Sequence, residues 1–132
     1  MISLKGPLNS GNAAGEDGSA TNNTDTTQPV VGKVLAVYLR YNDSPPAGTT
    51  DVIIATAGTD IPGAQTILSL PNAASDGWFY PREPVEDNAG SDVTFDGTNE
   101  IYAPYAIHDK VNVKIAQANS GDSVDAWLIL EL

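Results

Sequence analysis

Hydrophobic and polar residues alternate along several short stretches of this chain, as they do in β-strands that bury one face. Residues 32–41 place Leu35, Val37 and Leu39 on one side of the expected strand and a mixed set of residues on the other. This stretch therefore predicts a central strand of a sheet.

Two further strands are expected directly after this one. Residues 49–58 carry Val52 and Ile54 in one phase, and residues 64–70 form a shorter strand with two leucines in one phase. Pro, Gly, Asn and Asp gather in residues 42–48, which predicts a turn between the first strand and the second.

The most regular alternation lies in residues 110–117 and 124–132, which a short turn-like segment joins. We expect these two strands to pair as an antiparallel hairpin. Its apolar positions are Val111, Val113, Ile115, Val124, Ala126, Leu128 and Leu130.

The region before this pair is less regular. Residues 77–90 begin with three aromatic residues after a glycine and contain two prolines, which sheets accept at edges, strand starts and bulges. We expect an edge strand there. Residues 91–106 are rich in loop-forming residues, with a turn at Asp96-Gly97 and a short strand near Ile101.

The first 29 residues contain only three large apolar side chains apart from Met1: Ile2, Leu4 and Leu8. Such a segment cannot offset the entropy of its own ordering, so we expect it to fold only against a partner, with the rest of the chain folding without it. A flexible leader or a cloning remnant is the alternative interpretation.

These elements predict an all-β fold. About six to eight short strands with turns between them, and no helical periodicity, are typical of an antiparallel β-sandwich, jelly-roll-like in form. We expect residues 30–132 to form the sandwich and residues 1–29 to form an extended N-terminal arm.

Charge narrows the expected partners. Six basic and 17 acidic residues give a net charge of −11, and residues 30–132 alone carry 5 basic and 14 acidic residues, a net charge of −9. Nucleic acids and anionic membranes are bound largely through Lys and Arg, so neither is an expected partner. No apolar stretch approaches the roughly 20 residues that span a bilayer, and the N-terminus lacks a signal-peptide pattern, so we expect a soluble, unexported chain.

Catalytic chemistry has few candidates. The chain has no Cys and one histidine, His108, whose neighbour Asp109 should point to the opposite face of a strand. No nucleophile motif is present, so we expect no enzymatic activity. A hydrogen-bonded histidine at a strand end is the favoured interpretation of His108, over a general base.

Carboxylates concentrate in one loop-rich region, at Glu83, Glu86, Asp87, Asp92 and Asp96. Carboxylate oxygens of this density are able to bind Ca²⁺, but their spacing matches no known calcium motif. Solvated surface is the favoured interpretation, and we expect no metal site and no cofactor.

Aromatic residues could serve as a sugar-stacking platform, as core anchors or as interface contacts. Because consecutive aromatic residues point to both faces of a strand, we favour a core set and an interface set. The aromatic residues considered for the platform are Trp78, Phe79, Tyr80, Tyr102, Tyr105 and Trp127. The candidate interface residues are Trp78, Phe79, Tyr80, Arg82, Tyr102 and Tyr105.

Residues 49–58, 77–90 and 105–132 together resemble small β-rich virion proteins of tailed bacteriophages, some of which are capsid decoration (cement) proteins. The likeness extends over residues 32–132 and rests on the strand-and-turn pattern. It implies a structural protein that is made in the host cytoplasm and binds the major capsid protein from outside the shell.

The resemblance also agrees with an acidic body and with no active site. The arm would then clamp a neighbouring subunit through Ile2, Leu4 and Leu8 and through added-strand hydrogen bonds. From capsid geometry we expect a homo-oligomer, with a trimer favoured. Two alternatives stay open: another phage neck, tail or head-fibre module, and a carbohydrate-binding β-sandwich.

Overall fold

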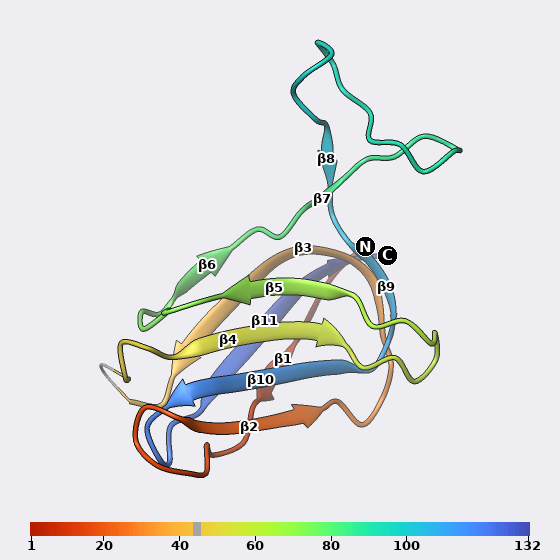
Figure 1. The fold of residues 1–132 in the computed structure, drawn as a ribbon. Helices are drawn as coiled ribbons and strands as arrows, with labels where there is room; N and C mark the ends of the chain where they lie inside the picture. The colour runs from red at the N-terminus through yellow and green to blue at the C-terminus, as the bar shows by residue number, and fades with distance from the viewer. Residues whose placement is uncertain (44–45) are drawn as a thin grey trace.

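The computed structural model describes residues 1–43 and 46–132, and within these residues the chain forms strands and no helix (Figure 1). Accordingly, no helix long and apolar enough to cross a membrane occurs in the described part of the chain. The turn expected at residues 42–48 includes Ser44 and Pro45, which lie outside the described residues. The strands are β1 (Ile2–Asn9), β2 (Ala20–Asp25), β3 (Val30–Tyr41), β4 (Asp51–Thr56), β5 (Thr66–Leu70), β6 (Gly77–Phe79), β7 (Glu83–Pro84), β8 (Tyr102–Ala103), β9 (Ala106–Asp109), β10 (Val111–Ala118) and β11 (Val124–Glu131).

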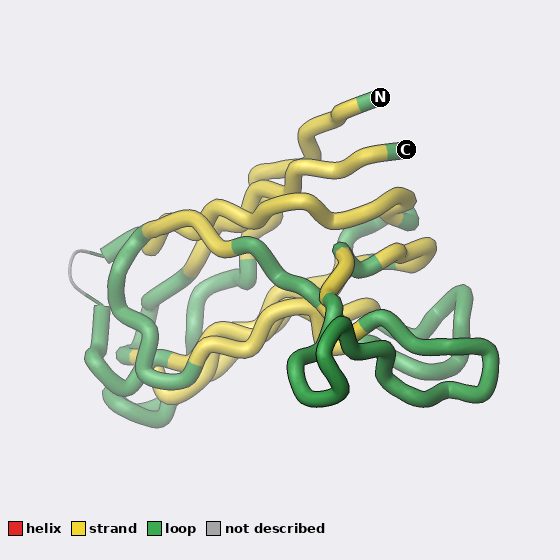
Figure 2. Tube along the Cα trace, turned by 90° about the horizontal axis from the view of Figure 1, so that it is seen from above, coloured by secondary structure: helices red, strands yellow, loops and turns green. Residues whose placement is uncertain are grey.

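Two antiparallel sheets face each other as the two layers of strands in Figure 2. Sheet I has the order β1-β11-β3-β6, and β9 also pairs with β3. Sheet II has the order β2-β10-β4-β5. The short strands β7 and β8 pair only with each other, outside both sheets.

Strand pairing follows the jelly-roll order. The pairs β1 with β11, β2 with β10, β3 with β6 and β4 with β5 are nested, as in one long hairpin. The additional pairs β11 with β3 and β10 with β4 roll this hairpin up, so that β1 to β4 alternate between the two sheets. The expected antiparallel, jelly-roll-like sandwich is confirmed.

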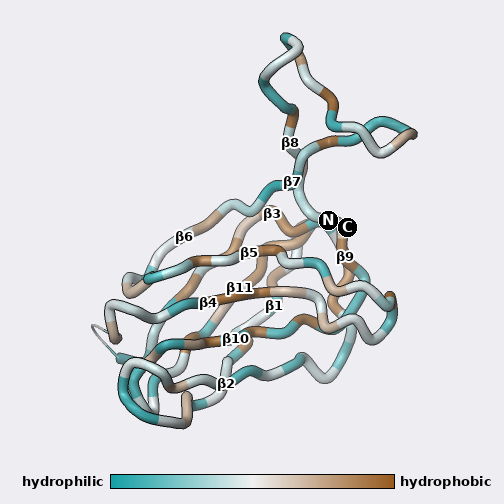
Figure 3. Tube along the Cα trace, in the orientation of Figure 1, coloured by the Kyte–Doolittle hydropathy of each residue, from teal (hydrophilic) through white to brown (hydrophobic). Residues whose placement is uncertain are grey.

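The hydrophobic core lies between the two sheets and is built from alternate residues of the long strands. In Figure 3 the central strands β4, β10 and β11 contain hydrophobic stretches, whereas the edge strand β2 is hydrophilic. The largest fully buried apolar side chains are Leu39, Ile54, Ile115, Leu128, Val30, Val34, Val37, Val52, Val111, Val113 and Val124. Apolar burial of this extent is the main favourable contribution to folding.

The prediction that the last two strands pair as an antiparallel hairpin is wrong. β10 lies in sheet II and β11 in sheet I, and the two strands do not pair with each other. The apolar residues of both strands are buried, as expected, but they face each other across the core. Alternation identifies the buried face of a strand, and it is the same whether the next strand lies beside it or opposite it.

β3 departs from strict alternation because it contains an irregularity. Opposite β11, Ile129 pairs with Ala36 and Leu130 pairs with Val34, so that Leu35 has no partner across the ladder. A bulge of this kind shifts the phase of the strand, and both Val34 and Val37 are therefore buried. The expected grouping of Leu35 with Val37 is wrong for this reason.

The N-terminal segment, residues 1–29, differs from the expected arm. It supplies an edge strand to each sheet, because β1 pairs with β11 and β2 pairs with β10. Ala13, between these strands, and Ala20, at the start of β2, belong to the core, and Ser10 accepts a hydrogen bond from the backbone of Val124. The segment is thus ordered against its own chain, mainly by backbone hydrogen bonds that a hydrophobicity pattern does not reveal.

An excursion of the chain interrupts the edge of sheet I. β6 pairs with residues 37–39 of β3, and β9 continues in the same direction against residues 30–33. Residues 81–104, which we call the lobe, leave the sheet between these two pieces and project away from the sandwich (Figure 1). An edge strand was expected in residues 77–90, and β6 forms one over the first three of these residues, while the strand expected near Ile101 is β8.

Candidate functional site

Three aromatic side chains form a row across the outer face of sheet I. Trp127 of β11 pairs with Tyr38 of β3, and Tyr38 pairs with Trp78 of β6. The ring centroids of Tyr38 lie 5.9 Å from Trp127 and 5.1 Å from Trp78, with interplanar angles of 49° and 54°. Such tilted pairs are favourable contacts. We call these three residues the aromatic row.

Arg40 and Gly6 both lie against the ring of Trp127. The guanidinium carbon of Arg40 lies 5.0 Å from the Trp127 ring centroid, and Arg40 also forms a 3.1 Å salt bridge with Asp125. On the other side, Gly6 of β1 has a φ of 146°, and a Cβ atom there would lie 2.9 Å from the Trp127 ring. Gly6 therefore lets the edge strand approach the indole.

The row holds two residues that the sequence did not place in the candidate interface, Tyr38 and Trp127. Both lie at outward positions of strands whose inward positions are buried. Reading the outward positions of all strands together, as well as the inward ones, would have singled them out. Trp78 was expected in the interface, and its side chain is 53% exposed.

The three apolar side chains of the N-terminal segment have different environments. Ile2 and Leu4 are 58% and 62% exposed on the edge strand β1, where they pair with Glu131 and Ile129. Leu8 follows an irregularity in β1 and packs against the core. Only Ile2 and Leu4 are therefore available to a partner.

The remaining candidate residues next to β6 divide between core and surface. Phe79 packs against the core, whereas Tyr80 is 64% exposed. Arg82 donates a 3.0 Å hydrogen bond to the carbonyl of Leu35, the residue that the bulge leaves without a partner. Arg82 thus fastens the start of the lobe to β3.

Tyr105 closes the lobe at its other end. Its side chain packs partly against the core, and its carbonyl accepts a 2.8 Å hydrogen bond from the backbone of Val34. Tyr102 lies within the lobe, exposed, and donates a hydrogen bond to Glu100, which raises the pKa of the tyrosine. The six expected interface residues therefore do not form one continuous surface.

The lobe is acidic and internally ordered. It carries six acidic residues and one basic residue, a net charge of −5. Backbone N–H groups of Ser91 and Ala89 bind the Asp87 carboxylate, and those of Asn99 and Thr98 bind Asp96. These hydrogen bonds lower the pKa of both carboxyl groups.

These hydrogen bonds also fix the two turns of the lobe. At its tip, next to the expected Asp96-Gly97 turn, Phe95 is 71% exposed. The lobe therefore presents Phe95 at its tip on an ordered, acidic support, and Ile101 and Tyr102 are exposed elsewhere on it.

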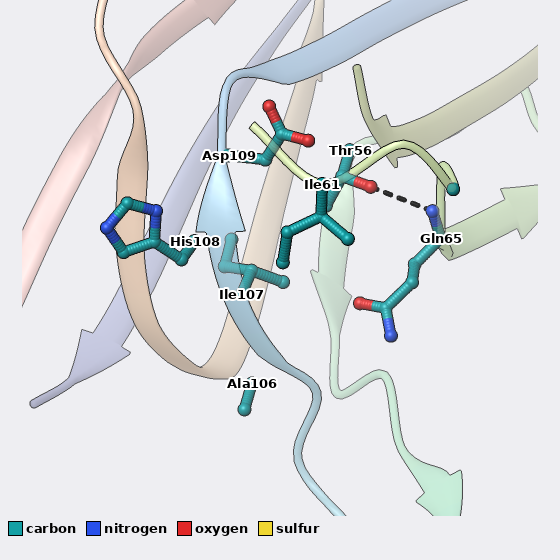
Figure 4. A pocket seen from close by; sticks show the side chains of 8 residues that line it. Thr56, Ile61, Gln65, Ala106, Ile107, His108 and Asp109 are labelled. Carbon is teal, nitrogen blue, oxygen red and sulfur yellow. Dashed lines mark hydrogen bonds between the residues drawn. The ribbon is translucent and has the colours of Figure 1, made fainter. Parts of the chain in front are cut away.

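His108 and Asp109, the candidate catalytic residues, line a small cleft. Its volume is about 110 Å³, well below the roughly 300 Å³ at which ligand pockets begin. His108 and Asp109 point to opposite sides of β9, as expected (Figure 4). His108 instead lies 3.3 Å from Asp60, with its side chain 63% exposed.

Asp109 has a structural role at the corner where the chain passes from sheet I to sheet II. Its buried carboxylate accepts hydrogen bonds from the Thr59 hydroxyl and from four backbone N–H groups, those of Gly58, Thr59, Asp60 and Lys110. The bond from the Thr59 hydroxyl, supported by those N–H groups, holds the pKa of Asp109 well below its usual range despite burial. The group holds the loop after β4 and is not poised for proton transfer.

Within residues 1–43 and 46–132, no group of three or more His, Cys, Asp or Glu side chains is arranged to hold a metal ion. The carboxylates considered as calcium ligands are spread along the lobe. No protein-family model, curated protein or solved structure gives a significant match to this chain.

Proposed function

We propose that this chain is a structural virion protein that binds a phage capsid lattice from the outside and stabilises it. The strand-and-turn pattern that resembles small phage virion proteins supports this proposal, and so does the jelly-roll architecture, which many viral capsid proteins share. Its net charge of −11 favours the outer surface of the shell over the surface that faces packaged nucleic acid.

The observation that carries the proposal is the distribution of exposed apolar side chains. Large exposed apolar residues lie on the strands of sheet I, at the chain termini, next to β6 and on the lobe, and Ile61 lies in the loop after β4, whereas no strand of sheet II carries one among the described residues. An unequal distribution of this kind marks an interaction surface. The protein is small and acidic, and its described residues bring no set of catalytic side chains together. These properties suit a role in binding.

Within this surface we assign the capsid contact to β1. It is an edge strand of sheet I, so its backbone is open to an added strand on the side away from β11. Ile2 and Leu4 are exposed beside this edge and would anchor the added strand. Of the three expected partner residues, Ile2 and Leu4 thus stay available in this proposal, whereas Leu8 packs against the core.

Co-sedimentation onto capsid shells that lack this protein tests the proposal. We expect saturable binding of the wild type, and binding weaker by at least about tenfold when Ile2 and Leu4 are both changed to Ser. Ile61→Ser is the matched control, because Ile61 is 57% exposed and lies in the loop after β4. Absence of wild-type binding would contradict the proposal, and equal weakening by the control would contradict the role of β1.

Carbohydrate binding is the second candidate, and the aromatic row favours it because sugars stack on exposed rings. The interplanar angles of 49° and 54° disfavour a flat platform for one glycan chain. Titration with a panel of soluble glycans distinguishes the two functions. Binding that is lost in Trp78→Ala, with no binding to shells, would support the carbohydrate function instead.

A further inference from the structure

The N-terminal segment docks on one continuous part of its own chain. β1 pairs with β11 and β2 pairs with β10, and the residues between β1 and β2 bond to the loop that joins β10 to β11. In this loop, Asp122 accepts a hydrogen bond from the backbone of Ala13, and Gly121 donates one to it. Among the described residues, every hydrogen bond that leaves residues 1–29 ends on residues 111–132. We call residues 111–132 the C-terminal unit.

A short linker, residues 27–29, connects the docked part of the segment to β3. Before the linker, Thr26 is fixed to β10, because its N–H donates to the carbonyl of Val111 and its hydroxyl accepts from the N–H of Val111. After the linker, Val30 begins β3 in the other sheet. The first two linker residues are exposed. Three residues span about 10 Å, which is about the distance between two packed sheets, so the linker has little slack.

The segment can leave its place without disturbing the order of the other strands. β1 and β2 are the outer strands of their sheets, and β2 forms the lower margin of the sandwich in Figure 1. The buried apolar side chains of the segment are Ala13 and Ala20, and Leu8 is partly buried. Its release therefore exposes little apolar surface, but it opens the edges of β10 and β11, which favours pairing with another copy of the segment.

We propose that two copies of this protein exchange their N-terminal segments, so that residues 1–26 of each copy lie on the C-terminal unit of the other. Because both copies have the same sequence, each hydrogen bond of the closed form, in which a copy keeps its own segment, is also formed in the exchanged pair. Only the linker differs between the two forms. The partner that fits the C-terminal unit is therefore a second copy of this chain.

Protein concentration sets the balance between the two forms. In the closed form, a short linker holds the segment at an effective concentration in the millimolar range. Copies that crowd together on a surface reach such concentrations, whereas dilute copies do not. The inference goes beyond the proposed function, since exchange requires no capsid shell.

Pairs of introduced cysteines report exchange directly, because the chain has no cysteine of its own. Asn23 of β2 lies opposite Lys114 of β10, at the separation of paired strand residues that a disulfide is able to bridge. In the double variant Asn23→Cys/Lys114→Cys, a closed copy forms a disulfide within one chain, whereas an exchanged pair forms disulfides between two chains. A denaturing, non-reducing gel separates the two products.

The reduced double variant is warmed into its melting transition, which releases the segment, and is then cooled and oxidised. We expect disulfide-linked dimers at about 1 mM protein and linked monomers at about 1 µM, because only the higher concentration approaches the effective concentration in the closed form. Ile53→Cys/Lys114→Cys is the matched control, since Ile53 of β4 also lies opposite Lys114 and both residues are outside the exchanged segment. The control should link within one chain at both concentrations. Monomers alone at the higher concentration, or equal amounts of dimer in the control, would overturn the proposal.

Linker length provides the second test, with the same cysteine pair. Deletion of Thr27 and Gln28 hinders the passage from one sheet to the other within one copy, so dimers should appear at concentrations at least about tenfold lower. Insertion of Gly-Ser-Gly-Ser after Thr27 gives the linker slack and should shift the appearance of dimers to higher concentrations. A shortened chain that melts like the wild type and links only within one chain would overturn the proposal. If the shortened chain does not fold, the first test decides with the natural linker.

Exchange and the capsid contact can fail separately. The outer edge of β1, with Ile2 and Leu4, is open in the closed form and in the exchanged pair. Binding to shells by a protein that links only within one chain would overturn exchange and leave the proposed function standing. Exchange by a protein that does not bind shells would do the reverse.

Discussion

The outer faces of the two sheets are built on the same strand geometry and carry different chemistry. On sheet II, the side chain of Asn112 donates hydrogen bonds to Asn23 and Asp25 across the β10 and β2 pair. On sheet I, the corresponding positions hold Trp127 and Tyr38 in contact. The inner faces of both sheets, in contrast, contribute their buried apolar residues to one core.

The inner faces of the two sheets determine folding, whereas the outer faces differ in what they are able to bind. Both inner faces serve one core, so they are under the same physical requirement. The polar residues of sheet II hydrogen-bond to one another and to water, and they need no partner to be satisfied. The side chains of the aromatic row bury only part of their apolar area, and the exposed remainder is available for an interface. Substitutions on the two sheets should therefore agree when they change the core and differ when they change the outer face.

The largest effect is expected when the N-terminal segment is removed, because this breaks both sheets at once. Deletion of residues 1–29 removes β1 and β2, exposes the edges of β11 and β10, and takes Ala13 and Ala20 from the core. We expect the cooperative thermal transition to be lost, as followed by circular dichroism. Deletion of residues 1–4 alone should keep a transition at a lower temperature. A wild-type melt for the longer deletion would contradict the topology.

Core substitutions should affect the two sheets alike. Leu128→Ala on sheet I and Ile54→Ala on sheet II each remove a fully buried side chain. Each should lower the free energy of unfolding by about 2–5 kcal/mol, through lost apolar burial and the cavity left behind. Denaturant titration measures both values. A loss in one sheet only would mean that the core is not shared.

The corner between the sheets should show a pH dependence. Because the folded-state pKa of Asp109 lies below its unfolded value, its carboxylate stabilises the fold above about pH 4, the usual pKa of the unfolded group. This contribution is lost as the pH falls further, towards the folded-state pKa. Asp109→Asn should be less stable than the wild type at pH 7, with a difference that shrinks below pH 4. A constant difference across that range would contradict the assignment.

Outer-face substitutions should have the smallest effect on stability and the clearest difference in function. Trp78→Ala removes one aromatic contact, and Asn112→Ala removes two side-chain hydrogen bonds, so each should cost about 1 kcal/mol in unfolding. Only Trp78→Ala should weaken binding to a partner that contacts the aromatic row. Weakening of the same size by Asn112→Ala would remove the distinction between the two faces.

Sequence pattern predicted the long strands after residue 30 and most of the core, because alternation depends only on which residues are buried. Val52, Ile54 and the apolar residues of the last two strands are buried as expected. The strand pairing could not be predicted from this pattern, because β10 and β11 show the same alternation whether they lie side by side or face to face. The bulge at Leu35 was missed because it inserts one residue without changing the composition of the strand.

The N-terminal segment was missed for a different reason. Its strands are held by backbone hydrogen bonds to β11 and β10, and its buried residues are small, such as Ala13, Ala20 and Ser10. Small residues do not produce a hydrophobic pattern. The candidate site was predicted in part: Trp78 was included, while Tyr38 and Trp127 lie on strands that were interpreted only for their buried side.

The lobe interrupts the edge of sheet I between β6 and β9. Arg82 and Tyr105, at the two ends of the lobe, both bind β3 within the gap between β6 and β9. A segment whose ends are anchored side by side can be lengthened, shortened or exchanged with little effect on the pairing of the strands on either side. The sandwich is then a scaffold that evolution, or an engineer, can equip with a new recognition loop or a foreign peptide.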